Sequence, residues 1–332
     1  MKIEPAFAEL LQGFFTERLM KQRRASAHTI ASYRDAFRLL LEFASRRLRK
    51  APSALKLEEI DAPLVAAFLD ELESVRKIGA RTRNLRLTAI HSFFNYVAFE
   101  APSCVAQVQR VLAIPAKRYT RTLVPFLTRD EVDALLAAPD RGTWSGRRDH
   151  ALILLAVQTG LRLSELTGLG TADVRLGAGA HVHVIGKGRK ERCTPLSTDT
   201  RSVLTAWLRE PTRDAGQPVF PNARGSRLSA HGVHYLLAKH VRTAANACPS
   251  IGLKRVSPHV LRHTTAMDLL QEGVEQRVLA LWLGHESVET TQIYLDANLE
   301  LKQKLLDKTT PPNGKPGRYR PDDKLLAFLK SL

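Results

Sequence analysis

The sequence predicts a mainly α-helical protein with one small β-hairpin, divided into two domains. Three observations predict this fold class. Apolar residues recur at helical spacing through most of the chain, and one segment alternates polar and apolar residues as a strand does. The chain of 332 residues is also long enough for two hydrophobic cores. The alternating segment is 180–185, and it is followed by a turn over 186–190 and a returning strand over 191–196.

Residues 1–113 predict helices only, and four helices of this size can close one small core. Ser26 and Asp61 are good N-caps for the second and third of them. The four helices are expected over 4–21, from Ser26 through Phe43, from Asp61 through Leu72, and over 81–99.

The fourth of these helices is expected to bury Leu85 and to carry a basic face early in its length. Arg81, Arg83 and Arg86 form that face. Arginines so arranged fit a surface that holds a polyanion, and they fit a solvated helix face equally well.

Residues 114–122 combine a proline with Lys117, Arg118 and Arg121 and lack an apolar period, so they predict a charged linker. The second domain is expected over 123–308. Its predicted elements include the hairpin, a capping box at Thr128, a buried helix over 149–158, and helices over 200–209 and 229–247.

The carboxy-terminal segment predicts an appendage to the second domain. The helix that contains Tyr294 is expected to continue to about Lys308. Residues 309–320 then read as a tether, because two consecutive prolines and two glycines interrupt any helix there. Residues 322–332 predict a short amphipathic helix whose apolar stripe is Leu325, Leu326, Phe328, Leu329 and Leu332.

The charge of the chain favours a polyanionic partner. The net charge is +17 and the isoelectric point is near 10.1; residues 1–116 carry +6 and the rest carries +11. Nucleic acid is the leading partner and an anionic membrane surface its competitor. No apolar run approaches the ~20 residues of a spanning helix, and no signal peptide is apparent, so a cytoplasmic protein is expected. The three scattered cysteines form neither a disulfide framework nor a zinc pattern.

The residues that carry chemistry are cations, histidines and one tyrosine. Residues 257–294 contain Pro-His-Val-Leu-Arg-His, then Leu-Gly-His, then Thr-Thr-Gln-Ile-Tyr. Upstream lie Thr-Gly-Leu-Arg-Leu-Ser-Glu-Leu over 159–166 and Gly-Lys-Gly-Arg-Lys-Glu-Arg over 186–192. Such a set suits an anionic reaction centre, because cations hold oxyanions while a phenol attacks.

These motifs, in this order, resemble those of the tyrosine recombinases, or phage integrases, over most of the chain. The resemblance implies an N-terminal four-helix core-binding domain and a mixed α/β catalytic domain. It implies that Tyr294 is the nucleophile, that two arginines and His285 hold the phosphate, that Lys187 gives a proton to the leaving oxygen, and that His259 is the acid/base residue. The catalytic set so implied is Arg162, Lys187, His259, Arg262, His285 and Tyr294, with no metal and no cofactor.

Each motif alone has a plainer interpretation. Arg162 beside Glu165 fits a structural salt bridge. His259 and His263 have a spacing that can bind zinc, but Val260 stands where such sites usually have glutamate, so His263 is expected to be a structural partner. Lys190 and Arg192 are expected to make backbone contacts.

The activity implied by the resemblance is site-specific DNA recombination through a 3′-phosphotyrosyl intermediate, with a mobile element as the favoured source. The implied partners are double-stranded DNA and further copies of this chain, as a tetramer on two DNA sites with the C-terminal helix docking in trans; no membrane is implied. The tether is long enough for the helix to dock on its own subunit as easily, so docking in cis stays open. Two alternatives stay open: a type IB topoisomerase, and a non-catalytic DNA-binding protein that keeps the fold.

Overall fold

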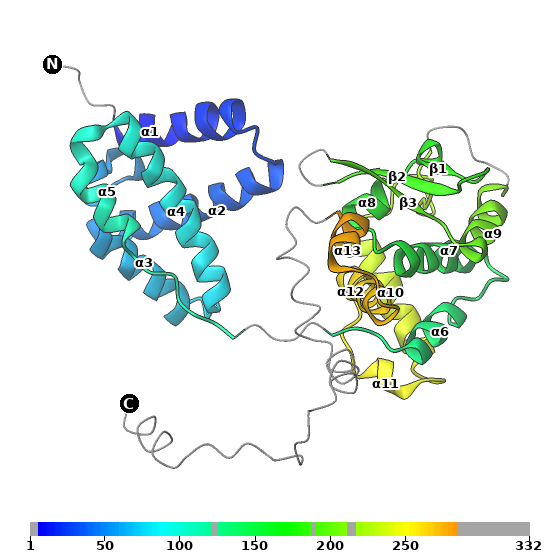
Figure 1. Ribbon diagram of the computed structural model, residues 1–332. Helices are drawn as coiled ribbons and strands as arrows, with labels where there is room; N and C mark the ends of the chain where they lie inside the picture. The colour runs from blue at the N-terminus through cyan, green and yellow to red at the C-terminus, as the bar shows by residue number, and fades with distance from the viewer. Residues whose placement is uncertain (1–5, 121–124, 187–189, 211–216, 285–332) are drawn as a thin grey trace, which may run out of the picture. The chain divides into compact units, whose positions relative to one another are not determined.

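The computed structural model describes residues 6–120, 125–186, 190–210 and 217–284. The chain divides into two compact units, residues 1–121 and 122–332 (Figure 1). Each unit has its own hydrophobic core. The division falls near the predicted linker; the domain boundaries themselves stay a prediction.

Every regular element in the described part of the first unit is a helix. Ser26 accepts a hydrogen bond from the Thr29 amide and Asp61 from the Leu64 amide, so both predicted N-caps are confirmed. The unit contains α1 (Phe7–Gly13), which runs on as a π-helical segment (Phe14–Gln22), then α2 (Ala27–Leu48), α3 (Ala62–Ser74), α4 (Ala80–Glu100) and α5 (Val105–Leu112).

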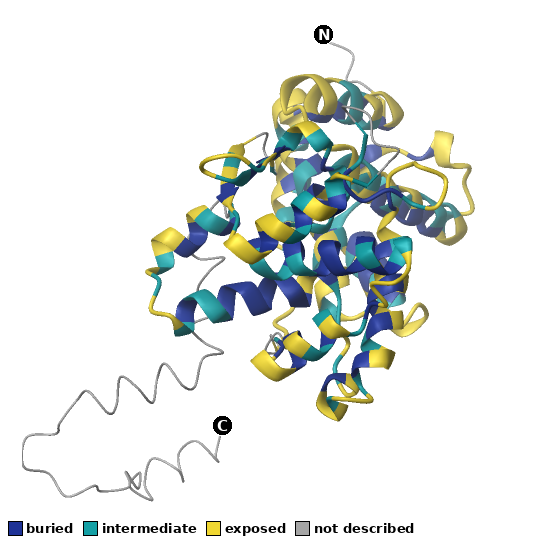
Figure 2. Cartoon of the chain, turned by 90° about the vertical axis from the view of Figure 1, so that its right-hand side faces the viewer, coloured by how far each residue is buried: buried dark blue, intermediate teal, exposed yellow. Residues whose placement is uncertain are grey.

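A group of aromatic rings fills the centre of this unit. Phe14 is fully buried and meets Phe93 edge to face, with ring centroids 5.5 Å apart. Phe37 meets Phe93 in the same way at 5.2 Å. Because the π-helical segment, α2 and α4 all contribute rings, these contacts bind the helices to one another. Buried and exposed residues fall on different sides of the same helix, as the colours along the helices of the chain show (Figure 2).

Two expectations about α4 and its neighbourhood are wrong. Leu85 is 57% exposed, whereas Arg83 is buried, because Arg83, Leu87 and Ile90 share the inward face of the helix. Arg83 donates to the carbonyl of Pro115 (3.1 Å), so it does not belong to an exposed basic face. The helix α5 was not among the four predicted.

The segment after α5 is held to this unit. Asn84 exchanges two hydrogen bonds with the backbone of Lys117, at 2.8 and 3.0 Å. The Lys117 ammonium also pairs with Glu73 on α3 (2.7 Å). The beginning of the predicted linker therefore has fixed contacts with α3 and α4.

The second unit combines helices with a three-stranded sheet. Its elements are α6 (Arg129–Ala137), α7 (Trp144–Thr159), α8 (Leu163–Gly168), β1 (Val174–Arg175), β2 (His181–Ile185), β3 (Glu191–Pro195), α9 (Thr198–Leu208), α10 (Ala230–Ala244), α11 (Pro249–Gly252), α12 (Pro258–Gln271) and α13 (Gln276–Leu283).

The sheet has the order β1-β2-β3 and is antiparallel throughout. In its hairpin Val182 pairs with Thr194 and Val184 pairs with Arg192. The predicted hairpin is thus confirmed. The strand β1 was not predicted, because two residues are too short to show alternation. The sheet lies at one edge of the unit, beside α8 (Figure 1).

The helix α7 is the centre of the second unit, with α6, α9 and α12 packed against it. It begins five residues before the predicted 149, because Thr143 caps it by accepting from the Gly146 amide (3.0 Å). It ends at Gly160, whose φ of +62° is the left-handed conformation that glycine adopts without strain. The predicted capping box at Thr128 and helices α9 and α10 are confirmed, with shifted bounds.

The segments expected beyond α13 lie outside the described residues. These are the continuation of the helix to 308, the tether over 309–320 and the helix over 322–332. Among the residues that the structure describes, no helix is long and apolar enough to cross a membrane.

Candidate active site

Arg162 stands at the junction between α7 and α8. The chain leaves α7 through Gly160, and Arg162 is the N-cap residue of α8. Glu165, in the first turn of α8, accepts a hydrogen bond from the Arg162 amide (2.8 Å). This contact fixes the start of the helix, so the backbone of Arg162 is held by its own neighbour.

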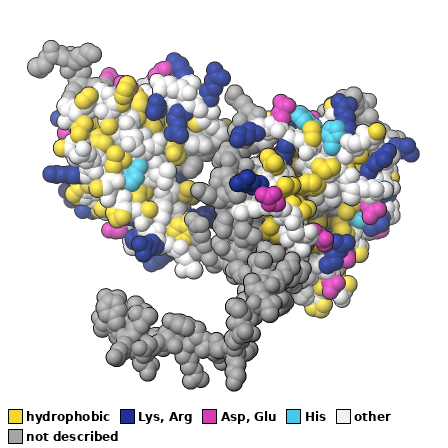
Figure 3. Space-filling view, viewed as in Figure 1, with side chains coloured by type: hydrophobic (Ala, Val, Ile, Leu, Met, Phe, Trp, Pro, Cys, Tyr) yellow, Lys and Arg dark blue, Asp and Glu magenta, His cyan; other side chains and the backbone are white. Residues whose placement is uncertain are grey.

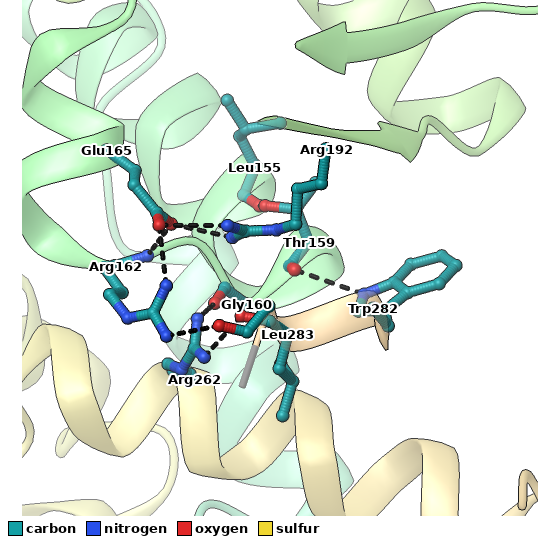
Figure 4. A network of polar contacts seen from close by, with 10 residues as sticks. Leu155, Thr159, Gly160, Arg162, Glu165, Arg192, Arg262, Trp282 and Leu283 are labelled. Atoms are coloured by element: carbon teal, nitrogen blue, oxygen red, sulfur yellow. Dashed lines mark hydrogen bonds and ion pairs between the residues drawn. The ribbon is translucent and has the colours of Figure 1, made fainter. Parts of the chain in front are cut away.

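Glu165 also holds two guanidinium groups. It accepts from Arg162 Nη1 (2.8 Å) and from both terminal nitrogens of Arg192 on β3 (3.0 and 2.7 Å) (Figure 4). Burial opposes the ionisation of this carboxylate, but the hydrogen bonds from Arg192 and Arg162 outweigh it and lower the pKa of Glu165 to about 2. Glu165 is therefore an anion at neutral pH and acts as a fixed support for the two arginines.

Arg262, on α12, is buried and joins the ends of two helices. Its Nη1 donates to the carbonyl of Gly160 (2.7 Å) and its Nη2 to that of Leu283 (2.6 Å). Arg162 Nη2 donates to the next carbonyl, that of Gly284 (2.7 Å). Two arginines that are 100 positions apart in sequence thus contact consecutive carbonyls at the end of α13 (Figure 4).

The two histidines of α12 lie in contact. The rings of His259 and His263 are 4.4 Å apart between centroids, at 69° to one another. His259 is exposed, whereas His263 is only 2% exposed. These positions fit an acid/base role for the first and a structural role for the second. No group of three or more His, Cys, Asp or Glu in the described part of the chain could hold a metal ion.

The other three predicted site residues, Lys187, His285 and Tyr294, lie outside the described residues. The glycines that directly precede two of them are described. A Cβ built on Gly186 would lie 3.1 Å from Glu165 Oε1, and one on Gly284 would lie 2.8 Å from Arg192 Nη1. Gly186 and Gly284, which precede Lys187 and His285, therefore lie against the cluster formed by Glu165, Arg162 and Arg192 (the Glu165 cluster).

Arg192 is the residue of this site whose part the sequence did not predict. A backbone contact was expected of it, but both its terminal nitrogens bind Glu165 and its side chain is only 11% exposed. Its partner comes from α8, 27 positions earlier, and no local spacing joins a strand to that helix. The only signal in the sequence was a cation on a predicted strand, which does not identify the partner.

The comparisons with known proteins agree with this architecture. Residues 125–300 match the phage integrase family, and residues 13–100 match the N-terminal SAM-like domain of phage integrases. A protein of Sinorhizobium fredii named as an integrase/recombinase (y4rC) is 66% identical over 327 residues, which cover 98% of each chain. The tyrosine recombinase XerC of Pelobacter propionicus is 33% identical over 301 residues, covering 90% of this chain and 94% of that one.

Solved structures share the fold. The XerH site-specific recombinase bound to its palindromic difH substrate has a TM-score of 0.65 at 23% identity, over 86% of this chain and 81% of that one. The Tn1549 transposon integrase in complex with circular intermediate DNA has a TM-score of 0.66 at 15% identity, over 90% and 98%.

The family match and the named relatives place the chain in the integrase class of DNA-recombining enzymes. The chain belongs to the phage integrase family and is a tyrosine-type site-specific recombinase. The family resemblance of the sequence motifs is thereby confirmed.

Proposed function

We propose that this recombinase cuts and rejoins double-stranded DNA through a 3′-phosphotyrosyl intermediate. The phenolic oxygen of Tyr294 attacks the phosphorus, the bond from phosphorus to the 5′ oxygen breaks, and Lys187 gives that oxygen a proton. The 5′ hydroxyl of another strand then reverses the step and frees Tyr294. The phosphodiester bond energy is kept in the covalent link, so no nucleotide cofactor takes part.

One observation carries this proposal: Arg162 and Arg262 meet at the end of α13, where the chain continues into His285. A phosphate that is attacked by a nucleophile gains charge on its non-bridging oxygens. Guanidinium groups stay charged and bind such oxygens in pairs. Because the two arginines are already held by protein carbonyls and Glu165, they stabilise that charge without reorganisation.

The remaining roles follow from the position of each residue in the chain. Lys187 comes directly after Gly186 on the hairpin, and His285 directly after Gly284, and both glycines contact the cluster. We assign proton donation to Lys187 and a hydrogen bond to the phosphate to His285. His259, exposed at the start of α12, is assigned the acid/base role toward Tyr294.

Double-stranded DNA is the proposed partner. The chain carries a net charge of +17, and Lys and Arg side chains are spread over the surface of each unit (Figure 3). The XerH and Tn1549 relatives were solved with DNA. Recognition by both units, as a clamp around the duplex, fits a charge of +6 in residues 1–116 and +11 in the rest.

We further propose a tetramer on two DNA sites, in which residues 322–332 dock on a neighbouring copy, and a mobile element as the source of the protein. Deletion of 309–332 is then expected to leave single-site binding unchanged while it weakens cooperative occupancy and recombination. Electrophoretic mobility shifts on one-site and two-site DNA measure this. Equal cooperativity in the truncated chain would contradict docking in trans.

The function is tested with a nicked DNA substrate. Cleavage near the nick releases a short fragment that carries the 5′ hydroxyl, so the reverse step cannot occur and the covalent complex is trapped. The wild type is expected to form the adduct, also in excess EDTA, and Tyr294→Phe to bind DNA without forming it. Tyr235→Phe, at an exposed position on α10, is the matched control and keeps full activity. Recombinant products between two intact duplexes that both carry the target site are expected of a recombinase, whereas a type IB topoisomerase only relaxes supercoiled DNA. Absence of any wild-type adduct would indicate a non-catalytic relative.

A further inference from the structure

We propose that Arg192 is a positioning residue that sets the β2–β3 hairpin, and with it Lys187, in register with Arg162. This inference rests on the proposed function, because it assigns Arg192 its effect through the proton donor of that reaction. Arg192 itself is not expected to touch the phosphate.

The guanidinium hydrogen bonds of Glu165 divide unequally, with two from Arg192 and one from Arg162. Arg192 places both terminal nitrogens on the two carboxylate oxygens. Arg162 gives one nitrogen to Glu165 and the other to the Gly284 carbonyl, and its side chain is 26% exposed against 11% for Arg192. The arrangement makes Arg192 the buried support and leaves Arg162 as the arginine that a ligand can reach.

Arg192 also contacts the backbone at two places that matter to the reaction. A Cβ on Gly186 would lie 3.2 Å from Arg192 Nη1, and a Cβ on Gly284 would lie 2.8 Å from the same atom. Both glycines leave room for the guanidinium to pack against their backbone. Lys187 follows the first and His285 follows the second. The guanidinium of Arg192 therefore lies between the Glu165 carboxylate and the two glycines that precede Lys187 and His285.

The strand pairing of the hairpin transmits the position of Arg192 to the base of the turn. Arg192 pairs with Val184 across the hairpin, and the Gly186 amide donates to the Lys190 carbonyl (2.8 Å). With Arg192 clamped to α8 through Glu165, both strands are held at the base of the turn that carries Lys187. A lysine at position 192 keeps the charge but cannot span both carboxylate oxygens. Arg192→Lys therefore loosens the hold of Glu165 on the hairpin without removing a cation.

A misplaced Lys187 should slow one step in particular, the protonation of the 5′ oxygen. A substrate with sulfur at that bridging position removes the requirement, because a thiol has a pKa of about 8.5 and leaves as the thiolate. A defect in proton donation is then rescued by the sulfur substrate. A defect in phosphate binding or folding is not.

The experiment measures single-turnover formation of the covalent adduct at saturating protein, with oxygen and sulfur substrates. Arg192→Lys is expected to slow adduct formation about 100-fold on the oxygen substrate and by less than about tenfold on the sulfur substrate. Arg162→Lys is expected to lose the same factor on both. Arg175→Lys, an exposed arginine on the neighbouring strand β1, is the charge-matched control and is expected to match the wild type.

A second variant tests the positioning of the hairpin base without changing any charge. Gly186→Ala places a methyl group against Glu165 and Arg192 and should shift the base of the hairpin by a few tenths of an ångström. We expect roughly a tenfold loss on the oxygen substrate and rescue by sulfur. Gly177→Ala, in the loop between β1 and β2, is its control, since a Cβ there meets nothing within 4 Å.

Wild-type rates for both variants on the oxygen substrate, or losses that sulfur does not reduce, would overturn the positioning role while leaving the recombinase intact. A wild type that forms no adduct on either substrate would instead defeat the proposed function, and the positioning role with it. The two failures are therefore distinguishable in one set of measurements.

Discussion

At the scale of single residues, Glu165 is the group on which the site depends. It accepts four hydrogen bonds, one from a backbone amide and three from guanidinium nitrogens. Its side chain is 3% exposed, so the charge on it is compensated by these partners and scarcely by water. Removal of its charge leaves Arg192 in a buried position without its anion.

Glu165→Gln is therefore expected to lower the free energy of unfolding by about 3 kcal/mol at pH 7. The folded-state pKa of Glu165, about 2, lies below its ordinary value of 4.5. A lowered carboxyl pKa gives stability that is present above pH 4.5 and is lost as the pH falls toward 2. The difference between wild type and variant should thus shrink between these pH values. Urea titrations at pH 7, 4 and 3 measure it.

Glu191→Gln is the control for that series, because its carboxylate is exposed and pairs only with His183 among the described contacts. It should change stability by less than about 0.5 kcal/mol at every pH. A difference for Glu165→Gln that does not vary with pH would contradict the ionised, doubly paired carboxylate.

Site residues that belong to a local motif could be predicted from the sequence, whereas a residue whose partner is distant in the sequence could not. Arg162 and Arg262 were singled out from their neighbours, and the structure brings both to the end of α13. The interpretation of Arg162 and Glu165 as a salt bridge also holds, since the pair exists and supports the site. Arg192 was given a lesser role, because its partner is fixed only by how the sheet packs beside α8.

At the scale of elements, the contact between the end of α7 and the end of α13 holds the arginines in place. Trp282 donates to the carbonyl of Thr159 (3.2 Å), and Arg262 joins Gly160 to Leu283. Gly160 allows this close approach, because a Cβ there would lie 2.8 Å from a methyl carbon of Leu283. A glycine is thus required both for its φ of +62° and for space.

Gly160→Ala is expected to destabilise the protein by roughly 1 kcal/mol for its positive φ and by a further ~1–3 kcal/mol for the clash with Leu283. Gly179→Ala isolates the first effect. Its φ of +68° is similar, but a Cβ there meets nothing within 4 Å. Thermal unfolding of both variants measures the difference. Equal losses for the two would show that the packing of α13 on α7 is not as described.

Long periodic helices and the hairpin could be predicted from sequence, whereas short elements and burial at helix ends could not. The helix α7 starts at Trp144 because Thr143 caps it, although the apolar run begins only later. The strand β1 and helix α11 are too short to carry a period. On α4, Arg83 displaced Leu85 from the inward face because Glu73 and Pro115 provide partners for its guanidinium.

At the scale of the whole molecule, two units with separate cores share the positive charge. Residues 1–116 carry +6 and the rest +11, and fixed contacts bind Lys117 to α3 and α4. Each unit therefore has the core to fold alone and the charge to meet DNA alone. A chain that uses both units on one duplex would neutralise more phosphates than either unit does.

Isolated residues 1–121 are expected to unfold cooperatively and to bind DNA more weakly than the whole chain. Each neutralised phosphate contributes about −0.9 to the slope of log K against log salt concentration. The whole chain should therefore show the steeper slope. Binding titrations at several salt concentrations measure both. Identical slopes would mean that only one unit contacts DNA.

The proposed function requires that Tyr294 carry the DNA after cleavage. Peptide mapping of the trapped adduct identifies the residue that carries it. Trypsin releases residues 278–302, in which Tyr294 is the only tyrosine. After nuclease digestion, mass spectrometry is expected to find the remaining nucleotide on that peptide and at Tyr294. A nucleotide on the peptide that contains Tyr319, or on any other residue, would show that Tyr294 is not the nucleophile.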